Sequence, residues 1–178
     1  MHKIMFNDEF SLTKAVLKGQ KTMTRRIVPK GLVTLIDQGK TKLAAGLAKY
    51  YIGEVVAVAQ AYRDVIDTGG YPHLAAQAGW ANKMFIRASL MPHQIRITSI
   101  RVERLQEISE ADCLREGIYK KTLCPPGVDY FYHSEPRSKW DVYPSPREAF
   151  AALIDKVSGK GTWDSNPWVF VYEFVLLI

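Results

Sequence analysis

The apolar positions along the chain predict several short strands separated by short helices. Strands favour alternating apolar and polar residues, with β-branched and aromatic side chains. Segments with this character are residues 3–6, 22–28, 54–60, 84–88, 94–105 and 168–177. The last of these is apolar on both faces, which is typical of a central strand. Within the long strand the apolar phase moves from Ile95 and Ile97 to Ile100 and Val102, and such a slip predicts a β-bulge.

Helix signals lie between these strands. Asn7 and Gly19 bracket a predicted helix over 8–18, because asparagine caps helix starts and glycine favours the left-handed residue that ends them. Ser109 and Gly117 bracket a two-turn helix in the same way. A further helix begins at Ser145-Pro146, and its apolar residues recur on one face.

Three stretches have weaker patterns. Residues 31–50 are helical in composition but are interrupted by glycines. Residues 64–83 are rich in Gly and Ala, and we expect a loop with one short helix. Residues 119–144 contain several prolines together with Tyr, His and Trp, which predicts a long loop. A loop of that length inside a compact domain is usually functional or mobile.

These elements predict an α+β fold in a single domain over 1–178. A chain of 178 residues buries roughly 70% of its unfolded surface, so it needs no disulfide or metal to fold. Five or more strands with short interspersed helices favour a mixed β-barrel over a parallel sheet of βαβ units.

The charge balance favours a polyanionic partner. Lys and Arg number 24 against 18 Asp and Glu, which gives a net charge of +6 and a pI near 9.3. An excess of this size suits RNA or DNA, since cations release counterions from phosphates. The plainer alternative is a basic soluble protein without such a partner. The charges are spaced along predicted strands, which suits a groove better than a disordered tail.

Targeting signals are not expected. The longest apolar stretches fall well short of the ~20 residues that a membrane span requires. The first nine residues reach acidic positions before an apolar core can form, which does not fit a secretory signal. Two cysteines, Cys113 and Cys124, are too few for a disulfide framework. We therefore expect a cytoplasmic protein with reduced thiols and no membrane partner.

Two common kinds of site are poorly supported. Residues 19–22 and 39–41 resemble fragments of a phosphate-binding loop, which needs a glycine five residues before a Gly-Lys pair. Thr34 occupies that position before Gly39, and Gly19 is not followed directly by lysine. The four histidines are scattered, and the spacings typical of zinc sites are missing. Cys124 and His133 are near each other in sequence, although a packed cysteine and a surface histidine are the simpler interpretation. We expect no metal and no cofactor.

The segment 21–26, Lys-Thr-Met-Thr-Arg-Arg, is the strongest candidate for chemistry. On a strand, alternation sends Thr24 and Arg26 to one face and the odd-numbered residues to the other. Gly19 allows the backbone to turn Lys21 towards the Thr24 face, so that two cations and a hydroxyl converge. The alternative is a solvated basic edge strand, which uses lysine to deter aggregation.

This segment resembles the signature of the ASCH domain family, a PUA-like group. The family pattern Gly-x-Lys-x-x-(Glu or Thr)-x-Arg is matched by Gly19, Lys21, Thr24 and Arg26. The similarity extends to the order of the surrounding elements, namely the preceding helix, the strand after Gly53, the strand and helix over 95–117, and the closing strand from Asn166-Pro167-Trp168.

The closing strand is similar to that of longer ASCH proteins of bacteria and their phages. The resemblance covers most of 3–118 and 146–178, while 29–50 and 119–144 look like insertions. It implies a PUA-like mixed β-barrel with short peripheral helices.

The resemblance also implies an activity. One bacterial branch of the family, with Thr at the position of Thr24, hydrolyses N(4)-acetylcytidine to cytidine and acetate through a Lys, a Thr and a downstream Glu. By this resemblance the partner is RNA or a modified nucleoside. The expected residues are Lys21, Thr24 and Glu116 for catalysis, and Gly19, Arg25 and Arg26 for substrate binding.

In this hypothesis Thr24 attacks the acetyl carbonyl. A hydroxyl needs a base at neutral pH, and Lys21 can serve if burial or the two following arginines lower its pKa. Glu116 would shuttle a proton to the leaving amine, and Arg26 would hold the oxyanion or the base ring.

Glu116 is unusual even without the family. It lies in the last turn of a well-capped helix, where the helix dipole disfavours an anion by about 0.3–1 kcal/mol. A residue that breaks a local rule in a consistent segment is a candidate for a site. The alternative is a surface ion pair with a nearby Arg or Lys.

Two other functions fit the same residues. A non-catalytic RNA-binding module would use the cations on phosphates and stack bases on aromatic residues of the 119–144 segment, namely Tyr130, Phe131, Tyr132 and Trp140. A third possibility is an interaction protein whose pocket binds another modified base.

Overall fold

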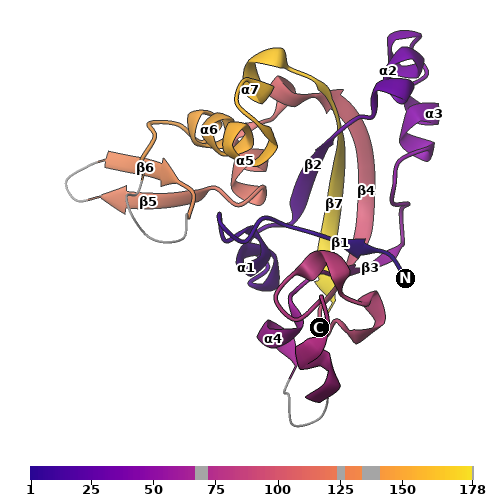
Figure 1. Cartoon of the computed structure of the whole chain (residues 1–178). Coiled ribbons are helices and arrows are strands. Elements are labelled where there is room, and N and C mark those ends of the chain that lie inside the picture. The colour runs from indigo at the N-terminus through magenta and orange to yellow at the C-terminus, as the bar shows by residue number, and fades with distance from the viewer. Residues whose placement is uncertain (67–71, 124–126, 134–140, 178) are drawn as a thin grey trace.

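A five-stranded mixed sheet forms the centre of the molecule (Figure 1). The computed structural model describes residues 1–66, 72–123, 127–133 and 141–177. The strand order is β1-β3-β4-β7-β2, in which β1 and β3 are parallel and every other pair is antiparallel. The strands are β1 (Lys3–Ile4), β2 (Met23–Ile27), β3 (Val55–Val58), β4 (Gln94–Arg104) and β7 (Trp168–Leu177). The predicted α+β class is confirmed, and β7 is an inner strand as its apolar sequence predicts.

The sheet is open and does not close into a barrel within the described residues. Its two edges, β1 and β2, are not paired with each other. They are linked instead by a side chain, since Arg26 Nη2 donates to the carbonyl oxygen of Met5, just beyond β1, at 2.6 Å. The two edges therefore approach each other at the point where the predicted site residues lie.

The long β4–β7 pair contains the bulge that the sequence predicts. Its register shifts between Ile97 and Ser99, where the apolar phase of the sequence slips. A bulge adds one residue to one strand and increases the local bend and twist. Both strands bend along their length (Figure 1).

Short helices surround the sheet. The α-helices are α1 (Leu12–Leu17), α2 (Lys30–Asp37), α3 (Thr41–Gly46), α4 (Tyr62–Val65), α5 (Glu110–Arg115), α6 (Pro146–Ser158) and α7 (Thr162–Ser165), and the 3₁₀ helices are η1 (Pro72–Ala76), η2 (Lys83–Phe85), η3 (Ala88–Leu90) and η4 (Leu105–Glu107). None of the helices in the described residues is long and apolar enough to cross a membrane.

Two helix and strand predictions need correction. Helix α1 begins at Leu12 and not at residue 8, because Ser11 adopts a left-handed conformation with φ of 51°. The strand predicted over 84–88 is wrong, since 3₁₀ turns occupy most of it. The side chain of Asn82 accepts from the amide of Met84 and begins the first of these turns.

The predicted long loop is partly wrong as well. Strands β5 (Tyr119–Leu123) and β6 (Gly127–Phe131) form a separate antiparallel hairpin, which extends away from the main sheet (Figure 1). The rings of Tyr119 and Phe131 stack at 5.5 Å across the hairpin. Cross-strand aromatic pairs of this kind stabilise a hairpin, and here they outweigh the turn-forming residues that suggested a loop.

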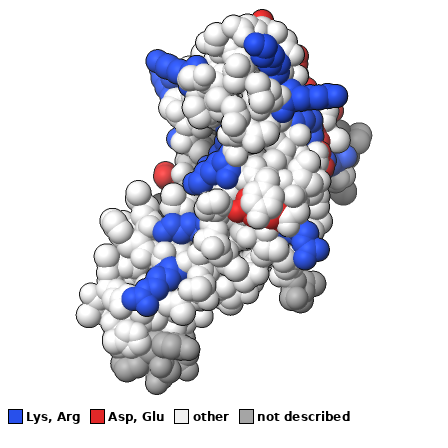
Figure 2. All heavy atoms as spheres, turned by 90° about the vertical axis from the view of Figure 1, so that its right-hand side faces the viewer, with Lys and Arg blue, Asp and Glu red and all other residues white. Residues whose placement is uncertain are grey.

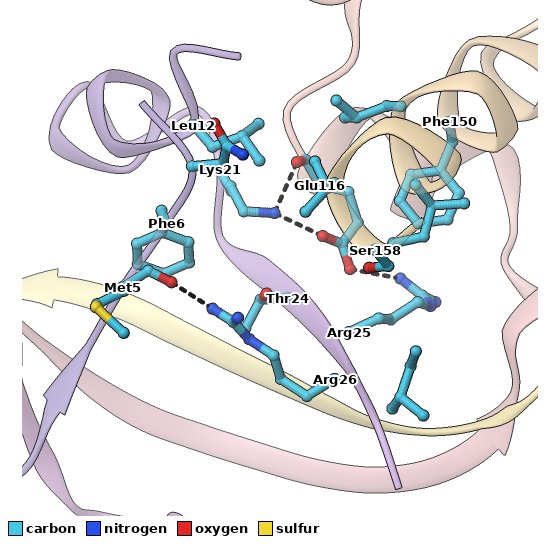
Figure 3. A pocket seen from close by; sticks show the side chains of 15 residues that line it. Met5, Phe6, Leu12, Lys21, Thr24, Arg25, Arg26, Glu116, Phe150 and Ser158 are labelled. Carbon is cyan, nitrogen blue, oxygen red and sulfur yellow. Dashed lines mark hydrogen bonds and ion pairs between the residues drawn. The ribbon is translucent and has the colours of Figure 1, made fainter. Parts of the chain in front are cut away.

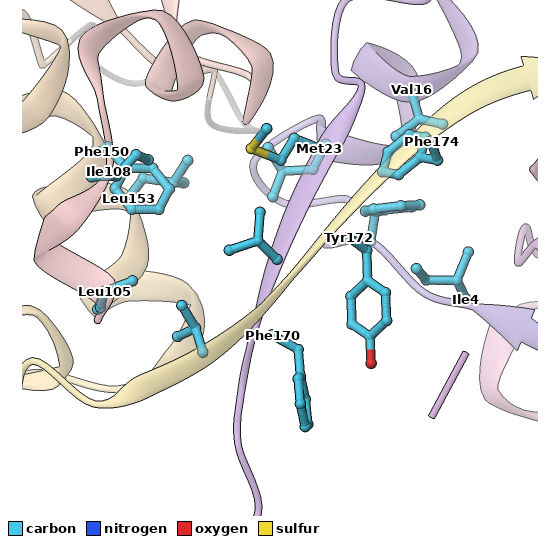
Figure 4. Close-up of a cluster of buried hydrophobic side chains, with 14 of the residues drawn as sticks. Ile4, Val16, Met23, Leu105, Ile108, Phe150, Leu153, Phe170, Tyr172 and Phe174 are labelled. Atoms are coloured by element: carbon cyan, nitrogen blue, oxygen red, sulfur yellow. The ribbon is translucent and has the colours of Figure 1, made fainter. Parts of the chain in front are cut away.

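The main core covers both faces of β7 (Figure 4). Phe170, Tyr172 and Phe174 point to one face, towards Ile4 of β1. The other face packs against η4 and α6, with Leu105, Ile108, Phe150 and Leu153. The prediction that α6 buries an apolar face is confirmed, and this packing fixes α6 beside the free edge of β2.

Candidate functional site

A cavity of about 250 Å³ lies along the free edge of β2. Residues just after β1 and the start of α1 line one side, and the C-terminal half of α6 lines the other (Figure 3). The polar residues that line it are Asn7, Lys21, Thr24, Arg25, Arg26, Glu116 and Ser158. The cavity therefore contains five of the six residues that the sequence selects.

Lys21 is buried inside this cavity, with 2% of its side chain exposed. Gly19 ends α1 with φ of 69°, and it does not line the cavity. Its left-handed turn brings the chain back so that the amide of Lys21 donates to the carbonyl of Ala15 at 3.0 Å. Lys21 precedes the first residue of β2, so strand alternation does not apply to it. Its side chain can thus join Thr24 in the cavity, as the sequence predicts.

The Lys21 amine donates two hydrogen bonds to Glu116, at the C-terminal end of α5. The Nζ atom lies 2.5 Å from the Glu116 carboxylate oxygen Oε2 and 2.7 Å from the Glu116 carbonyl oxygen. Glu116 is the C-terminal cap residue of α5, where backbone carbonyls lack helical partners. Lys21 therefore supplies the cation that a helix C-terminus favours and at the same time neutralises an anion that the helix dipole disfavours.

Gly117 makes this close approach possible. It has φ of 105°, and a Cβ atom built on it would lie 3.1 Å from Leu12 Cδ2 and 3.7 Å from the Lys21 side chain. An added Cβ atom would therefore crowd Leu12 of α1 while the residue adopts a strained backbone, and it would only touch the lysine stem. The sequence predicts Gly117 as a helix stop, and the structure adds this packing role.

Burial lowers the pKa of Lys21 below its usual value, and the Glu116 carboxylate partly offsets this effect. The physical cause is desolvation, because removing an ammonium from water disfavours its charged form. Arg25 and Arg26 also disfavour the charge, but more weakly. The lysine is consequently closer to acting as a neutral base than a surface lysine is.

Arg25 holds the second oxygen of the same carboxylate. Its Nη1 atom donates to Glu116 Oε1 at 3.0 Å, and its Nη2 atom lies 2.6 Å from Glu103. The Arg25 side chain is 1% exposed. Glu116 is thus fixed between a lysine on one side of the β2 edge and an arginine on the other.

A wider ion network supports Arg25 on this face of the sheet. Arg25 and Arg101 both pair with Val171 of the intervening strand β7, which places them in one row. With the two ion pairs of Glu116, the network contains four cations and four carboxylates, namely Lys21, Arg25, Arg101 and Arg115 with Glu103, Asp112, Glu116 and Glu173. These carboxylates offset the desolvation cost of burying the Arg25 guanidinium beside the cavity.

Thr24 and Arg26 lie on the opposite face of β2 from Arg25, as alternation predicts. The Thr24 side chain is buried at the cavity wall (Figure 3). Among the described residues its hydroxyl has no protein hydrogen-bond partner, so it is available to a ligand. Arg26 is exposed and lies with its guanidinium carbon 5.8 Å from the centre of the Phe6 ring.

The backbone of β2 adds a further pair of polar groups. Val28 donates its amide to Trp168, and Phe174 donates its amide to Thr22. In an antiparallel pair these bonds alternate along the strand, so the even-numbered residues face β7. The amide and carbonyl of Arg25 must then face the free edge, beside the cavity. Sequence reasoning missed this donor and acceptor, because it needs the strand order to show that β2 is an edge.

The solvated-edge alternative is wrong for Lys21 and Arg25, which are both buried. The alternative of a surface ion pair for Glu116 is partly wrong. The residue does pair with a lysine and an arginine, but it is buried, with only 4% exposed. Sequence reasoning did not find the supporting residues Arg101, Glu103 and Glu173. The available signal was the presence of opposite charges at Arg101 and Glu103, two residues apart on one predicted strand, and of Glu173 within an otherwise apolar strand.

The aromatic residues proposed for base stacking are mostly not accessible. Phe131 and Tyr132 are 6% and 4% exposed, and Tyr132 packs edge-on against Phe10. Tyr130 is partly buried in the β6 strand. Trp140, like Cys124, lies outside the described residues. Within the described part of the chain, no three His, Cys, Asp or Glu residues are grouped as metal ligands would be.

The chain was compared with known families, curated proteins and solved structures. None of the three comparisons finds a match.

Proposed function

We propose that this chain is a PUA-like protein of the ASCH type that binds a modified nucleoside and hydrolyses N(4)-acetylcytidine to cytidine and acetate. The observation that carries the proposal is the convergence of Lys21, Thr24 and Glu116 on one cavity from two parts of the chain. The Gly-Lys-Thr-Arg signature over 19–26 supports the family.

The cavity suits a base-sized group. Its volume of about 250 Å³ lies below the ~300–1,000 Å³ of pockets for drug-sized ligands. Leu12, Phe150 and Leu153 provide apolar walls for a flat ring. The free amide and carbonyl of Arg25 offer a donor and an acceptor side by side, the pattern that the edge of a pyrimidine can match.

The first chemical step is attack by the Thr24 Oγ on the acetyl carbonyl carbon. The hydroxyl proton passes to the Lys21 amine, which acts as the base in its neutral form beside the Glu116 carboxylate. Arg26 faces the oxyanion that develops on the carbonyl oxygen. Positioned proton transfer of this kind contributes about 10²–10⁴-fold in rate.

Collapse of the intermediate breaks the C–N bond. The exocyclic nitrogen leaves as the amine of cytidine and takes its proton from the Lys21–Glu116 pair. The acetyl group is then an ester on Thr24. Water attacks this ester with the same pair as base, which releases acetate and restores the threonine hydroxyl.

The test is incubation with N(4)-acetylcytidine followed by chromatographic measurement of cytidine and acetate. Thr24→Ala should abolish the release of both products. Thr22→Ala is the matched control, since Thr22 does not line the cavity and contacts Arg115, and it should retain activity. Full activity in Thr24→Ala would refute the nucleophile.

A non-catalytic RNA-binding module is the second candidate. It is favoured by the spread of Lys and Arg over the face in Figure 2, where acidic side chains are confined to a few places. Salt-sensitive RNA binding without any release of acetate would support it, because phosphate contacts weaken as salt rises.

A further inference from the structure

A second cavity of about 370 Å³ adjoins the first on the Thr24 face of the sheet. It extends over the β2–β7 surface between β1 and the segment that follows α3. Met5, Arg26 and Ile27 line both cavities, so the two are adjacent. The other lining residues are Lys3, Pro29, Leu47, Lys49, Tyr50, Phe170 and Tyr172.

The floor of the second cavity is aromatic. Tyr50 and Tyr172 meet edge to face with ring centres 5.3 Å apart, and Phe170 lies 6.2 Å from Tyr172. All three rings are buried. Around them the side chains of Ile27 and Leu47 are 48% and 54% exposed, which provides open apolar surface for a flat ligand.

The rim of the second cavity is positively charged. Among the described residues, its lining contains Lys3, Arg26 and Lys49 and no carboxylate. Lys3 donates to the backbone carbonyls of Met84 and Ile86, and Arg26 donates to that of Met5. Lys49 lies 5.4 Å from the centre of the Tyr50 ring.

Within the described residues none of these three cations makes an ion pair, whereas Lys21, Arg25, Arg101 and Arg115 are all neutralised by carboxylates. Carbonyl contacts orient a cation without removing its charge. Three cations without a carboxylate partner therefore lie around the second cavity. A phosphate is the anion that such a cluster beside apolar surface suits, because a nucleotide presents a flat base together with a phosphate.

We propose that the second cavity binds a nucleotide joined to the one whose base enters the first cavity. This inference rests on the proposed function and names its substrate class: a single-stranded RNA carrying the modified base, in preference to the free nucleoside. Arg26, shared by both cavities, would contact the phosphate that links the two nucleotides.

The test compares a five-residue RNA carrying one central N(4)-acetylcytidine with the free nucleoside. We expect kcat/KM to be at least about tenfold higher for the RNA, because a second site adds binding energy outside the reacting group. Lys49→Glu should lower kcat/KM for the RNA about tenfold, because it removes one charge-assisted contact and places a carboxylate beside the phosphate. It should leave hydrolysis of the free nucleoside unchanged. Lys49→Ala should give a smaller loss in the same direction.

Lys120→Glu is the charge-matched control. Lys120 is exposed on the β5–β6 hairpin, away from both cavities, and its substitution should leave the preference for RNA intact. Binding of the same RNA, labelled at one end, is followed by fluorescence anisotropy in parallel, so that binding is measured even without turnover.

Equal kcat/KM for the two substrates, or RNA binding that Lys49→Glu does not weaken, would overturn the second site and leave the proposed hydrolysis standing. If neither substrate releases acetate, the proposed hydrolysis is overturned. RNA binding that is seen by anisotropy and weakened by Lys49→Glu would still support the second site.

Discussion

The Lys21 amine contacts Glu116 twice, through the carboxylate at 2.5 Å and through the backbone carbonyl at 2.7 Å. The two residues are 95 positions apart in the sequence. This buried contact therefore joins the start of β2 to the end of α5 across the edge of the sheet. It serves the fold and the candidate chemistry at once, and substitutions must be designed to separate these roles.

Removing the Glu116 charge should strongly destabilise the protein. Glu116→Gln leaves the Lys21 ammonium and the Arg25 guanidinium buried without their shared anion. Breaking a buried pair by removing one partner costs about 3–5 kcal/mol. We expect a loss of this size in the free energy of unfolding, measured by urea denaturation at pH 7.

Lys21→Met should cost less than Glu116→Gln, because Arg25 still neutralises the carboxylate. Glu110→Gln, at an exposed position of the same helix, is the control and should change stability by less than about 0.5 kcal/mol. A loss in Glu116→Gln no larger than in this control would contradict the structural role of the pair.

The elements with strong local signals could be predicted from the sequence. The caps at Ser109 and Ser145, the stop at Gly117 and the phase slip in β4 all depend on neighbouring residues, and all are confirmed. The start of α1 and the hairpin at Tyr119–Leu123 were missed. In these places a left-handed Ser11 and cross-strand ring packing overrode the local preferences, and neither is visible in one segment alone.

The candidate site was predictable as a set of residues but not as an arrangement. The signature over 19–26 and the unusual position of Glu116 indicated Lys21, Thr24 and Glu116. The strand order, which leaves β2 with a free edge, could not be read from local patterns because it depends on which distant strands pair. The bridging position of Glu116 between Lys21 and Arg25 follows from that order.

The rate of hydrolysis should rise with pH. If Lys21 acts as the base, only its neutral form is active, and the lysine loses its proton as pH rises. Burial lowers the pKa of Lys21 below the usual 10.5, so the rise in kcat/KM should be centred below that pH. Steady-state kinetics across about pH 6–11, a range that extends from well below to just above the usual lysine pKa, provide the measurement. Lys21→Arg should lose activity across the whole range, because arginine stays charged throughout and cannot accept the proton.

Acid should destabilise the fold through Glu173. Hydrogen bonding and charge from Arg115, and the charge of Arg101, hold the pKa of this carboxyl below its usual 4.5. A carboxyl whose pKa is lower in the folded state stabilises the protein above its unfolded pKa, and this contribution is lost as pH falls through the folded value.

Glu173→Gln should therefore be less stable than the native protein at pH 7 and converge with it in strong acid. Urea denaturation at several values below pH 5 provides the measurement. A difference in unfolding free energy that stays constant with pH would contradict the role of this ion pair.

Gly19, which precedes Lys21 in the chain, and Gly117, which lies against its side chain, should respond differently to substitution by alanine. Both have positive φ, 69° at Gly19 and 105° at Gly117, so either substitution adds backbone strain of about 1–3 kcal/mol. At Gly19 a Cβ atom meets nothing within 4 Å, whereas at Gly117 it lies 3.1 Å from Leu12 and 3.7 Å from the Lys21 stem. Gly117→Ala must therefore also displace Leu12, a residue of the cavity wall.

We expect Gly19→Ala to lower stability and leave kcat/KM for the acetylated nucleoside largely unchanged. Gly117→Ala should lower both, because a shift of Leu12 changes the wall that positions the substrate beside Lys21. Thermal unfolding and acetate release, measured on the same preparations, separate the two effects. If Gly19→Ala abolished turnover while the fold persisted, Gly19 would have a direct part in binding the substrate, as the sequence signature first suggested, and the cavity would have to extend to the turn after α1.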